Sequence, residues 1–376
     1  MKTPFSFGKI ATGNFFINRA EELRTLSINF SSGLNTMIIS PRRWGKSSLV
    51  KKSSKVLKKQ DKKIKVCFID MFAINTEKEF YETLATQVIK KSSNKFEDWV
   101  KTGKDFLKSL VPVFSFGIDP SSDFSVKFEF QDEKKQFSEI LDLPEKIATK
   151  KNIRFVICID EFQKVTQIPE SLAFQQKLRS VWQHHTKVSY CLYGSKRHII
   201  NELFQNQSMP FYRFGDILYL SKIAASHWLD HIKTSFEKNN KAIDDAVIER
   251  IIQYARNHPY YVQQLSHQVF INTDTAATDE TVENAIEEIF LYNGVMYMRE
   301  TENLTMLQIN MLRAILAGEK ALTSKEVISK YQLGTPGNIQ RLKQSLESKE
   351  IIDFFEKQPE FIDPFFELWC RRNISV

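Results

Sequence analysis

The segment Ser40-Pro41-Arg42-Arg43-Trp44-Gly45-Lys46-Ser47 has residue types and a spacing that suit the binding of nucleotide phosphates. It follows a short apolar run and precedes a segment with helical periodicity, which is the context that a phosphate loop needs. Backbone N–H groups of such a turn and the N-terminus of the next helix attract an anion. We therefore expect Lys46 to reach the β- and γ-phosphates of ATP and the Ser47 hydroxyl to bind Mg²⁺.

This phosphate loop departs from the general pattern Gly-x-x-x-x-Gly-Lys-Ser/Thr at its first position, where Ser40 replaces glycine. Gly45 still allows the backbone to approach a phosphate, because it has no Cβ. Ser48 follows in the predicted helix and completes the candidate nucleotide-binding set. Arg42 and Arg43 have two interpretations, contact with phosphates or exposure to solvent. Taken alone, the match of this segment to the phosphate-loop pattern does not exclude coincidence.

A second candidate motif is an apolar run, residues 154–159, that ends in Asp160 and Glu161. A buried strand of this composition would deliver both carboxylates at the sheet edge where open α/β sheets bind ligands. We expect Asp160 to hold the Mg²⁺ shell through water and Glu161 to polarise the attacking water. Two acids at a strand end also arise by chance. Their position after the phosphate loop, with a strand and helices between, favours a nucleotide site.

Two further polar residues each have a functional and a structural interpretation. Ser195 follows the apolar run 188–194 and is a polar sensor of the γ-phosphate, the cap of the next helix, or both. Arg213 is either an arginine finger, acting in cis or across a subunit interface, or an ordinary surface arginine. Both alternatives stay open for Arg213.

The elements that must position these residues alternate between short apolar runs and helical segments. This alternation predicts an α/β core, a mostly parallel sheet with helices on both faces. A β-hairpin is predicted as an insertion at about 111–131, with turn formers at 119–123, and serves either as a partner-binding flap or as decoration. The predicted strands are 35–39, 64–70, 153–160 and 188–194, and the predicted helices are 47–59, 76–93, 134–150 and 170–184.

The last part of the chain has the pattern of a winged helix, with three helices, a turn and a two-stranded wing. Pro336 opens the helix that would read a DNA groove, although winged helices also bind proteins. Its predicted outer face carries Asn338, Arg341, Lys343 and Gln344. We therefore divide the chain into a core at 1–219, a helical lid at 220–300 and a winged helix-turn-helix domain at 301–376.

The composition is that of a globular protein, with 42% hydrophobic and 26% charged residues. Its apolar runs have strand length, far below the roughly 18 residues of a membrane-spanning helix, so we expect no membrane association. The four cysteines form no CxxC pair, which favours reduced thiols and a cytoplasmic location. The net charge of +8 permits nucleic-acid binding without establishing it.

These motifs resemble those of the archaeal-type ATPases, a prokaryotic family within the AAA+/STAND group of P-loop NTPases. The similarity extends over nearly the whole chain. It rests on the segments Phe16-Ile17-Asn18-Arg19, Pro41-Arg42-Arg43, Ile159-Asp160-Glu161-Phe162-Gln163, Tyr193-Gly194-Ser195, Phe211-Tyr212-Arg213, Asn257-His258-Pro259 and Phe361-Ile362-Asp363-Pro364. A phosphate loop without the first glycine is usual in that family, so the resemblance accounts for Ser40.

The resemblance implies an AAA-like core, a helical lid and a C-terminal winged helix. It also implies adenine contacts from Phe16, Ile17 and Arg19, and a nucleotide-facing element at His258 and Pro259. The sequence departs from the family at Arg213, which follows tyrosine here where the family has Gly-Arg.

Together, the residues and the resemblance predict a Mg²⁺-dependent ATPase, a slow phosphoanhydride hydrolase that acts as a nucleotide-driven switch or regulator. The alternative is an ATP-gated DNA-binding protein of the origin-recognition or transposition-helper type, which would use the winged helix on double-stranded DNA. A third is an ATP-binding scaffold without hydrolysis, against which the intact pair of Asp160 and Glu161 argues. ATP and ADP are the expected ligands, and a protein partner or a second copy of the chain is an open possibility.

Overall fold

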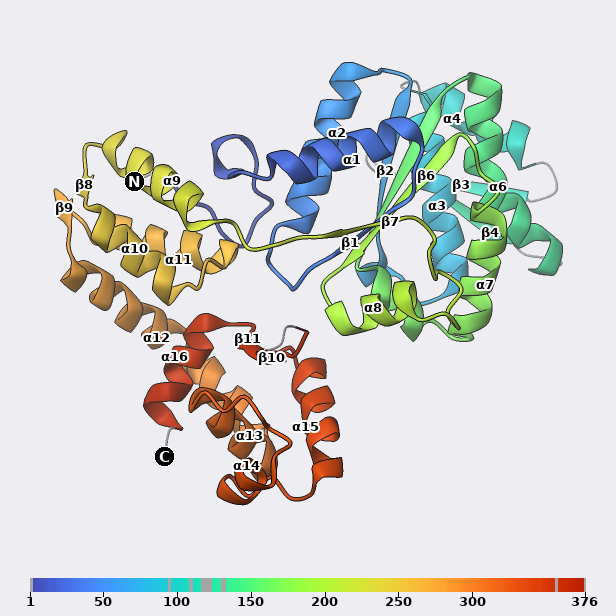
Figure 1. Ribbon diagram of the computed structural model, residues 1–376. Coiled ribbons are helices and arrows are strands. Elements are labelled where there is room, and N and C mark those ends of the chain that lie inside the picture. The colour runs from blue at the N-terminus through green and yellow to red at the C-terminus, as the bar shows by residue number, and fades with distance from the viewer. Residues whose placement is uncertain are drawn as a thin grey trace. The chain divides into compact units, whose positions relative to one another are not determined.

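The computed structural model describes residues 3–93, 96–107, 111–115, 124–129, 133–355 and 358–374. The chain forms two compact units (Figure 1). The first, the sheet unit, comprises Arg19–Ser40 and Lys46–Leu220, and the second, the helical unit, comprises Met1–Asn18, Pro41–Gly45 and Ser221–Val376. The middle of the phosphate loop therefore belongs to the helical unit, and its two ends belong to the sheet unit.

A parallel sheet forms the centre of the sheet unit, as the alternating pattern predicts. Its strands are β1 (Thr36–Ile39), β2 (Ile64–Asp70), β5 (Arg154–Asp160), β6 (Val188–Gly194) and β7 (Asp216–Tyr219). Their order is β2-β5-β6-β1-β7, so β6 separates the strand before the phosphate loop from the strand that ends at Asp160. The sequence analysis did not predict β7, an edge strand of four residues that buries none of them.

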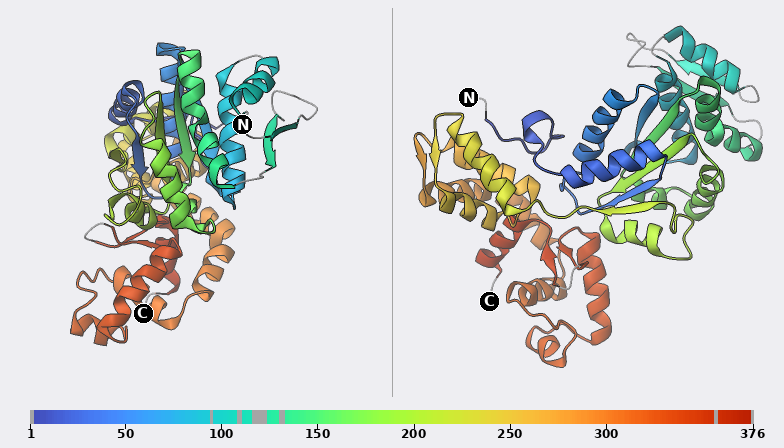
Figure 2. Two further views of the ribbon diagram at one scale, coloured as in Figure 1. Left: turned by 90° about the vertical axis from the view of Figure 1, so that its right-hand side faces the viewer. Right: turned by 45° about the horizontal axis from the view of Figure 1, so that its top comes forward.

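Helices cover both faces of this sheet (Figures 1 and 2). They are α1 (Ala20–Ser32), α2 (Lys46–Gln60), α3 (Glu77–Ser92), α4 (Phe96–Phe106), α6 (Glu133–Lys151), α7 (Ser171–Trp182) and α8 (Arg197–Gln205). The connection through α2 crosses from β1 to the far strand β2, and the later connections return across the sheet. Because parallel connections are right-handed, α2 lies on one face and α3, α6 and α7 lie on the other.

An antiparallel hairpin of β3 (Val111–Ser115) and β4 (Ser125–Glu129) lies outside the central sheet. Its strand β4 packs on α3, where Thr86 Oγ1 accepts a hydrogen bond of 3.0 Å from the Val126 N–H and Glu82 Oε1 accepts one of 3.1 Å from the Phe128 N–H. These bonds satisfy backbone donors at the edge of the hairpin. The predicted turn at 119–123 lies outside the described residues.

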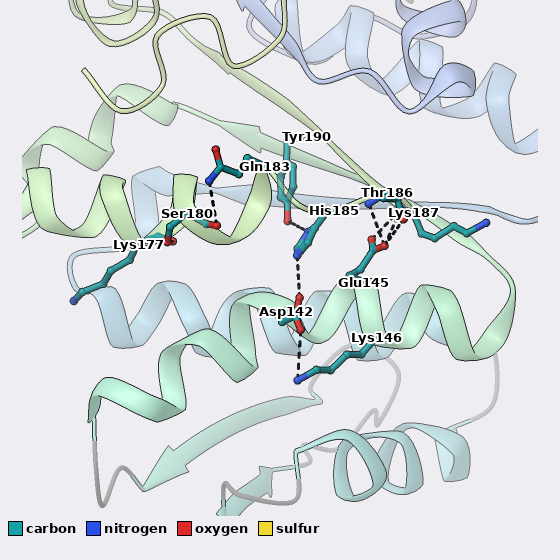
Figure 3. Close-up of polar contacts among 10 residues, drawn as sticks. All are labelled: Asp142, Glu145, Lys146, Lys177, Ser180, Gln183, His185, Thr186, Lys187 and Tyr190. Atoms are coloured by element: carbon teal, nitrogen blue, oxygen red, sulfur yellow. Dashed lines mark hydrogen bonds and ion pairs between the residues drawn. The ribbon is translucent and has the colours of Figure 1, made fainter. Parts of the chain in front are cut away.

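A polar network joins the loop before β6 to helix α6 (Figure 3). The ring of His185 lies 2.9 Å from the Tyr190 hydroxyl through Nδ1 and 3.3 Å from the Asp142 carboxylate through Nε2. The Glu145 carboxylate accepts hydrogen bonds from the backbone N–H groups of the two residues that follow His185. Burial lowers the pKa of His185, so a neutral ring makes this link. The network fixes the start of the central strand β6.

The first part of the helical unit is a group of helices, in agreement with the predicted helical pattern after residue 220. They are α9 (Ala225–Glu237), α10 (Asp245–Tyr254), α11 (Pro259–Ile271) and α12 (Asp279–Glu302), with a short parallel pair of β8 (Ala242–Ile243) and β9 (Ala276–Ala277). The N-terminal segment packs on these helices, because the Phe5 ring lies 5.9 Å from Phe236 and 6.0 Å from Phe270. The Ser6 N–H also donates a hydrogen bond of 2.9 Å to Gln263 Oε1.

The second part of the helical unit has the element order of a winged helix. It consists of α13 (Met306–Leu316), α14 (Lys325–Lys330), α15 (Pro336–Ser348), β10 (Ile352–Asp353), β11 (Glu360–Phe361) and α16 (Pro364–Asn373). Ser324 caps the second of these helices, because its Oγ accepts a hydrogen bond of 3.2 Å from the Val327 N–H. Across the described ranges, no helix is long and apolar enough to cross a membrane.

Candidate functional site

The two ends of the phosphate loop are held by the sheet unit. Strand β1 ends one residue before Ser40, and helix α2 begins at Lys46. The Lys46 ammonium donates hydrogen bonds of 3.1 Å to the Ser40 carbonyl oxygen and 3.3 Å to the Ser40 hydroxyl. Lys46 and Ser48 are buried, with exposed fractions of 5% and 8%. The strand–turn–helix context that the sequence predicts is therefore confirmed, and the lysine points back into the turn.

Two oxygen-bearing side chains meet beside the loop. The Ser47 hydroxyl donates a hydrogen bond of 2.6 Å to Asp160 Oδ2, and Asp160 Oδ1 accepts one of 2.9 Å from the Glu161 N–H. Burial raises the pKa of Asp160, while these two hydrogen bonds act in the opposite direction. A hydroxyl and a carboxylate are hard oxygen ligands that suit Mg²⁺.

The protein supplies few ligands at this position. Among the described residues, no group of three His, Cys, Asp or Glu side chains could hold a metal ion. This fits Mg²⁺, which commonly binds through one or two protein groups together with substrate phosphates and water. The residues present therefore fit the expected ion only as a complex with a nucleotide.

Glu161 follows β5 and lies in the left-handed region of the backbone, with φ of 51°. Such a conformation costs a non-glycine residue on the order of 1 kcal/mol and is common at functional sites. Its Oε2 accepts a hydrogen bond of 3.1 Å from the Ser195 hydroxyl and another from Gln163 Nε2. The structure therefore brings together Glu161 and Ser195, the two residues that the sequence analysis singled out. Helix α8 has Lys196 at its N-cap, so the capping role considered for Ser195 is wrong.

The sequence analysis gave Gln163 no role. Its side chain packs under the end of β6, where a Cβ added to Gly194 would lie 1.8 Å from Gln163 Oε1. Any residue with a Cβ at this position would therefore displace the Gln163 amide, which donates to Glu161. The signal available in the sequence is the adjacency of Gly194 and Ser195 at the end of an apolar strand.

None of the described contacts of Arg213 involves Asp160 or Glu161. It is exposed in the turn before β7, where its guanidinium is 5.2 Å from the Tyr212 ring and its N–H donates a bond of 3.4 Å to the Phe204 carbonyl. Its role as an arginine finger remains a prediction.

The residues predicted to contact adenine lie where the chain passes from the first segment of the helical unit, which ends at Asn18, to the sheet unit, which begins at Arg19. Arg19 is the N-cap of α1 with φ of 74°, and its guanidinium donates a hydrogen bond of 2.7 Å to Glu22. Ile17 packs against the core of the helical unit, and Phe16 follows a short 3-10 turn. Adenine contact by these residues stays a prediction.

The middle of the phosphate loop contacts the helical unit to which it belongs. Arg43 has φ of 65°, and its Nη1 donates a hydrogen bond of 3.2 Å to the Tyr261 hydroxyl. The guanidinium also lies 4.4 Å from the centre of the Tyr260 ring, a cation–π contact. The Trp44 ring meets the His258 ring edge to face at 6.1 Å. The structure therefore brings His258, which the resemblance implies is nucleotide-facing, to the loop.

His258 is buried and neutral. Its Nδ1 accepts a hydrogen bond of 3.3 Å from the Tyr260 N–H at the start of α11, and Pro259 occupies the first position of that helix. Burial, together with the charges of Lys222 and Arg43, lowers the pKa of His258 to about 3. The proton therefore stays on Nε2, which has no hydrogen-bond partner of normal geometry in the part of the chain that the structure describes.

Comparison with known families gives two matches. A family described as an ATPase domain predominantly from Archaea matches residues 16–265. A family described as a probable winged helix domain matches residues 295–372. A search of curated proteins gives no match.

Solved structures share this fold over nearly the full length. The Walker-type ATPase PABY2304 of Pyrococcus abyssi is 18% identical with a TM-score of 0.63, covering 95% of this chain and 96% of that one. The ORC2 protein of Aeropyrum pernix, in ADPNP-ADP complexes, is 14% identical with a TM-score of 0.55, covering 98% of each chain. The ORC1 protein of Aeropyrum pernix, in complex with DNA, is 11% identical with a TM-score of 0.50, covering 96% of this chain and 94% of that one.

At these identities the structural similarity concerns the fold alone. The family match itself spans well over half of the chain and includes the phosphate loop, Asp160, Glu161 and His258. The match over residues 295–372 covers the elements from α13 to α16. The chain therefore belongs to the family of ATPase domains found predominantly in Archaea, and a winged helix domain follows its ATPase region.

Proposed function

We propose that this chain binds Mg·ATP at the phosphate loop and hydrolyses it slowly, as a nucleotide-driven switch or regulator. The observation that carries the proposal is the connected set of hydrogen bonds from Ser47 through Asp160 to Glu161 and Ser195. It unites one group for each task that phosphoryl transfer to water requires. Membership of the ATPase family supports the same activity.

Each of these residues has a proposed role. Lys46 leaves its bonds with Ser40 to neutralise the β- and γ-phosphates, and Ser47 and Asp160 hold the Mg²⁺ shell. When bound, Mg²⁺ neutralises charge on the phosphate oxygens. Glu161 orients the attacking water and takes its proton. Ser195, which holds the Glu161 carboxylate, senses the γ-phosphate through it.

Further residues have roles in the proposed function. Pro41, Arg42, Arg43, Trp44 and Gly45 shape the loop, and Gly45, with φ of 93°, needs a backbone that glycine adopts without strain. His258 and Pro259 face the loop as a neutral element that responds to the nucleotide. Adenine contact by Phe16, Ile17 and Arg19 and an arginine finger at Arg213, in cis or in a homo-oligomer, are further parts of the proposal.

Binding and turnover of ATP test this function. The parent should bind Mg·ATP and release phosphate, and Lys46→Ala should weaken nucleotide affinity by about tenfold or more, because a charge-assisted contact to phosphate is lost. Lys55→Ala, an exposed lysine on the same helix, is the matched control and should leave both unchanged. A parent that binds no nucleotide, or a Lys46→Ala variant that matches it, would refute the proposal.

A second candidate function is ATP-gated binding of double-stranded DNA. Its supporting observation is the surface of α15, where Gln340, Arg341 and Gln344 are exposed. Such side chains suit a major groove. A mobility shift that weakens steeply with salt and depends on ATP would favour it, and an Arg341→Ala variant should reduce the shift. Absence of any shift in every nucleotide state would leave a protein partner or a second copy of the chain as the target of the switch.

A further inference from the structure

The side chain of Arg43 is held at two points, although the residue as a whole is exposed. The Tyr261 hydroxyl accepts its hydrogen bond, and the Tyr260 ring lies beneath its guanidinium. Arg43 also has the left-handed backbone conformation, with φ of 65°, which a non-glycine residue keeps only when its surroundings stabilise it. The two tyrosines therefore stabilise the shape of the phosphate loop at its centre.

Tyr261 is in turn linked to the winged helix. Its ring meets Phe365 edge to face at 5.5 Å, and burial together with the charge of the nearby Asp363 carboxylate raises the pKa of its hydroxyl. Asp363 Oδ1 caps helix α16 by accepting bonds of 2.8 Å from the Phe365 N–H and 3.1 Å from the Phe366 N–H. The other oxygen, Oδ2, accepts a bond of 3.3 Å from the Tyr297 hydroxyl. Asp363 therefore joins the last helix of the winged domain to the tyrosine that holds Arg43.

These groups surround one cavity of about 270 Å³ within the helical unit. Arg43, Tyr261 and Asp363 line it together with Glu350, which is in the turn before β10. Arg42 forms an ion pair of 3.2 Å with Glu350. Arg42 thus contacts the winged domain directly, whereas Arg43 contacts Tyr261, which lies against the winged domain.

We propose that Tyr261 and Asp363 are positioning residues that act on the phosphate loop through Arg43 and couple nucleotide binding to the winged helix. The inference rests on the proposed nucleotide binding. A loop held in its bound shape costs less to order when phosphate arrives, so the chain of contacts raises nucleotide affinity. Because coupling is reciprocal, bound nucleotide stabilises the cap of α16 by the same factor.

Nucleotide affinity of single and double variants tests this coupling. Tyr261→Phe removes only the hydroxyl, and Asp363→Asn keeps an acceptor for the α16 cap but removes the charge. Tyr297→Phe is the matched control, because it removes a buried hydroxyl from Asp363 without touching Arg43. The probe is a fluorescent ADP analogue with Mg²⁺, and hydrogen exchange of the Phe365 and Phe366 amides is followed with and without it.

Tyr261→Phe and Asp363→Asn should each weaken ADP affinity by about fivefold, and Tyr297→Phe should change it by less than about twofold. Arg43→Gln combined with Tyr261→Phe should bind no more weakly than Arg43→Gln alone, because both changes break one chain of contacts. The parent should show slower exchange of the two amides with nucleotide, and Tyr261→Phe should lose that effect.

Three results would overturn the coupling while leaving nucleotide binding intact. They are parental affinity in both Tyr261→Phe and Asp363→Asn, additive losses in the double variant, or equal losses in Tyr261→Phe and Tyr297→Phe. If the role of Tyr261 were merely structural, Tyr261→Phe would lower the free energy of unfolding but would change ADP affinity no more than Tyr297→Phe does. A parent that binds no ADP or ATP would overturn the coupling and the proposed function together.

Discussion

The hydroxyl of Ser47 donates a hydrogen bond of 2.6 Å to the carboxylate of Asp160, although 113 residues separate them in the chain. Ser47 lies in the first turn of α2, and Asp160 is the last residue of β5. The fold brings them together because parallel strands present their carboxyl ends at one edge of the sheet. The pair places two side-chain oxygens beside the phosphate loop.

Ser47→Ala should remove the effect of Mg²⁺ on nucleotide binding. The parent should bind ATP about tenfold or more tightly with Mg²⁺ than with a chelator, and the variant should show little of this difference, because one of its two ligands is lost. Isothermal titration with and without the chelator measures both affinities. Ser54→Ala is the control, since Ser54 Oγ bonds only to the Lys51 carbonyl within α2 among its described contacts. An undiminished Mg²⁺ effect in Ser47→Ala would contradict the assignment.

Gly194→Ala should slow hydrolysis while leaving ATP affinity within about twofold. The added Cβ would lie 1.8 Å from Gln163 Oε1 and so displace the amide that donates to Glu161. Loss of one orienting hydrogen bond at a general base should cost about tenfold in turnover. Steady-state phosphate release gives the rate, and Gly337→Ala, whose Cβ would have no neighbour nearer than 3.9 Å, is the control. Parental turnover in Gly194→Ala would remove Gln163 from the site.

The burial of His258 makes the stability of the chain depend on pH. Its pKa in the folded state is lowered to about 3, below its ordinary value of 6.5. The unfolded state therefore binds more protons between these values, and stability is lost as the pH falls below 6.5. Between pH 7 and pH 5 this residue should contribute a loss of roughly 2 kcal/mol in the free energy of unfolding.

Chemical denaturation at pH 7 and pH 5 measures this loss. His258→Gln should lose about 2 kcal/mol less than the parent over that interval. His227→Gln, at an exposed position, should behave as the parent does. Equal losses in the parent and His258→Gln would show that the imidazole is not held neutral.

Much of the sheet unit could be predicted from the sequence, because buried parallel strands are continuous apolar runs. The bounds of β2 and β6 agree with the predicted 64–70 and 188–194. Helix α4 and strand β7 were not predicted, and β7 is defined by its pairing with β1, which is distant in the sequence.

The candidate site likewise has residues that the sequence predicts and residues that it does not. Lys46, Ser47, Asp160 and Glu161 could be predicted because phosphate and metal chemistry restricts residue types at fixed points of a strand or turn. Gln163 could not, since a neutral amide three residues beyond the end of β5 has no chemical signature of its own. The link from Arg43 through Tyr261 to Asp363 also depends on side chains from three distant segments, so it required the folded chain.

The proposed hydrolysis is tested most directly by phosphate release from the Glu161→Gln variant, with ATP affinity measured on the same preparation. The substitution keeps the shape of the side chain and removes the carboxylate that would take the proton of water. Turnover should fall by about a hundredfold or more while ATP affinity stays within about threefold of the parent, and Glu170→Gln, an exposed acid, should change neither. A Glu161→Gln variant that releases phosphate at the parental rate would contradict the assignment of Glu161 and the mechanism built on it.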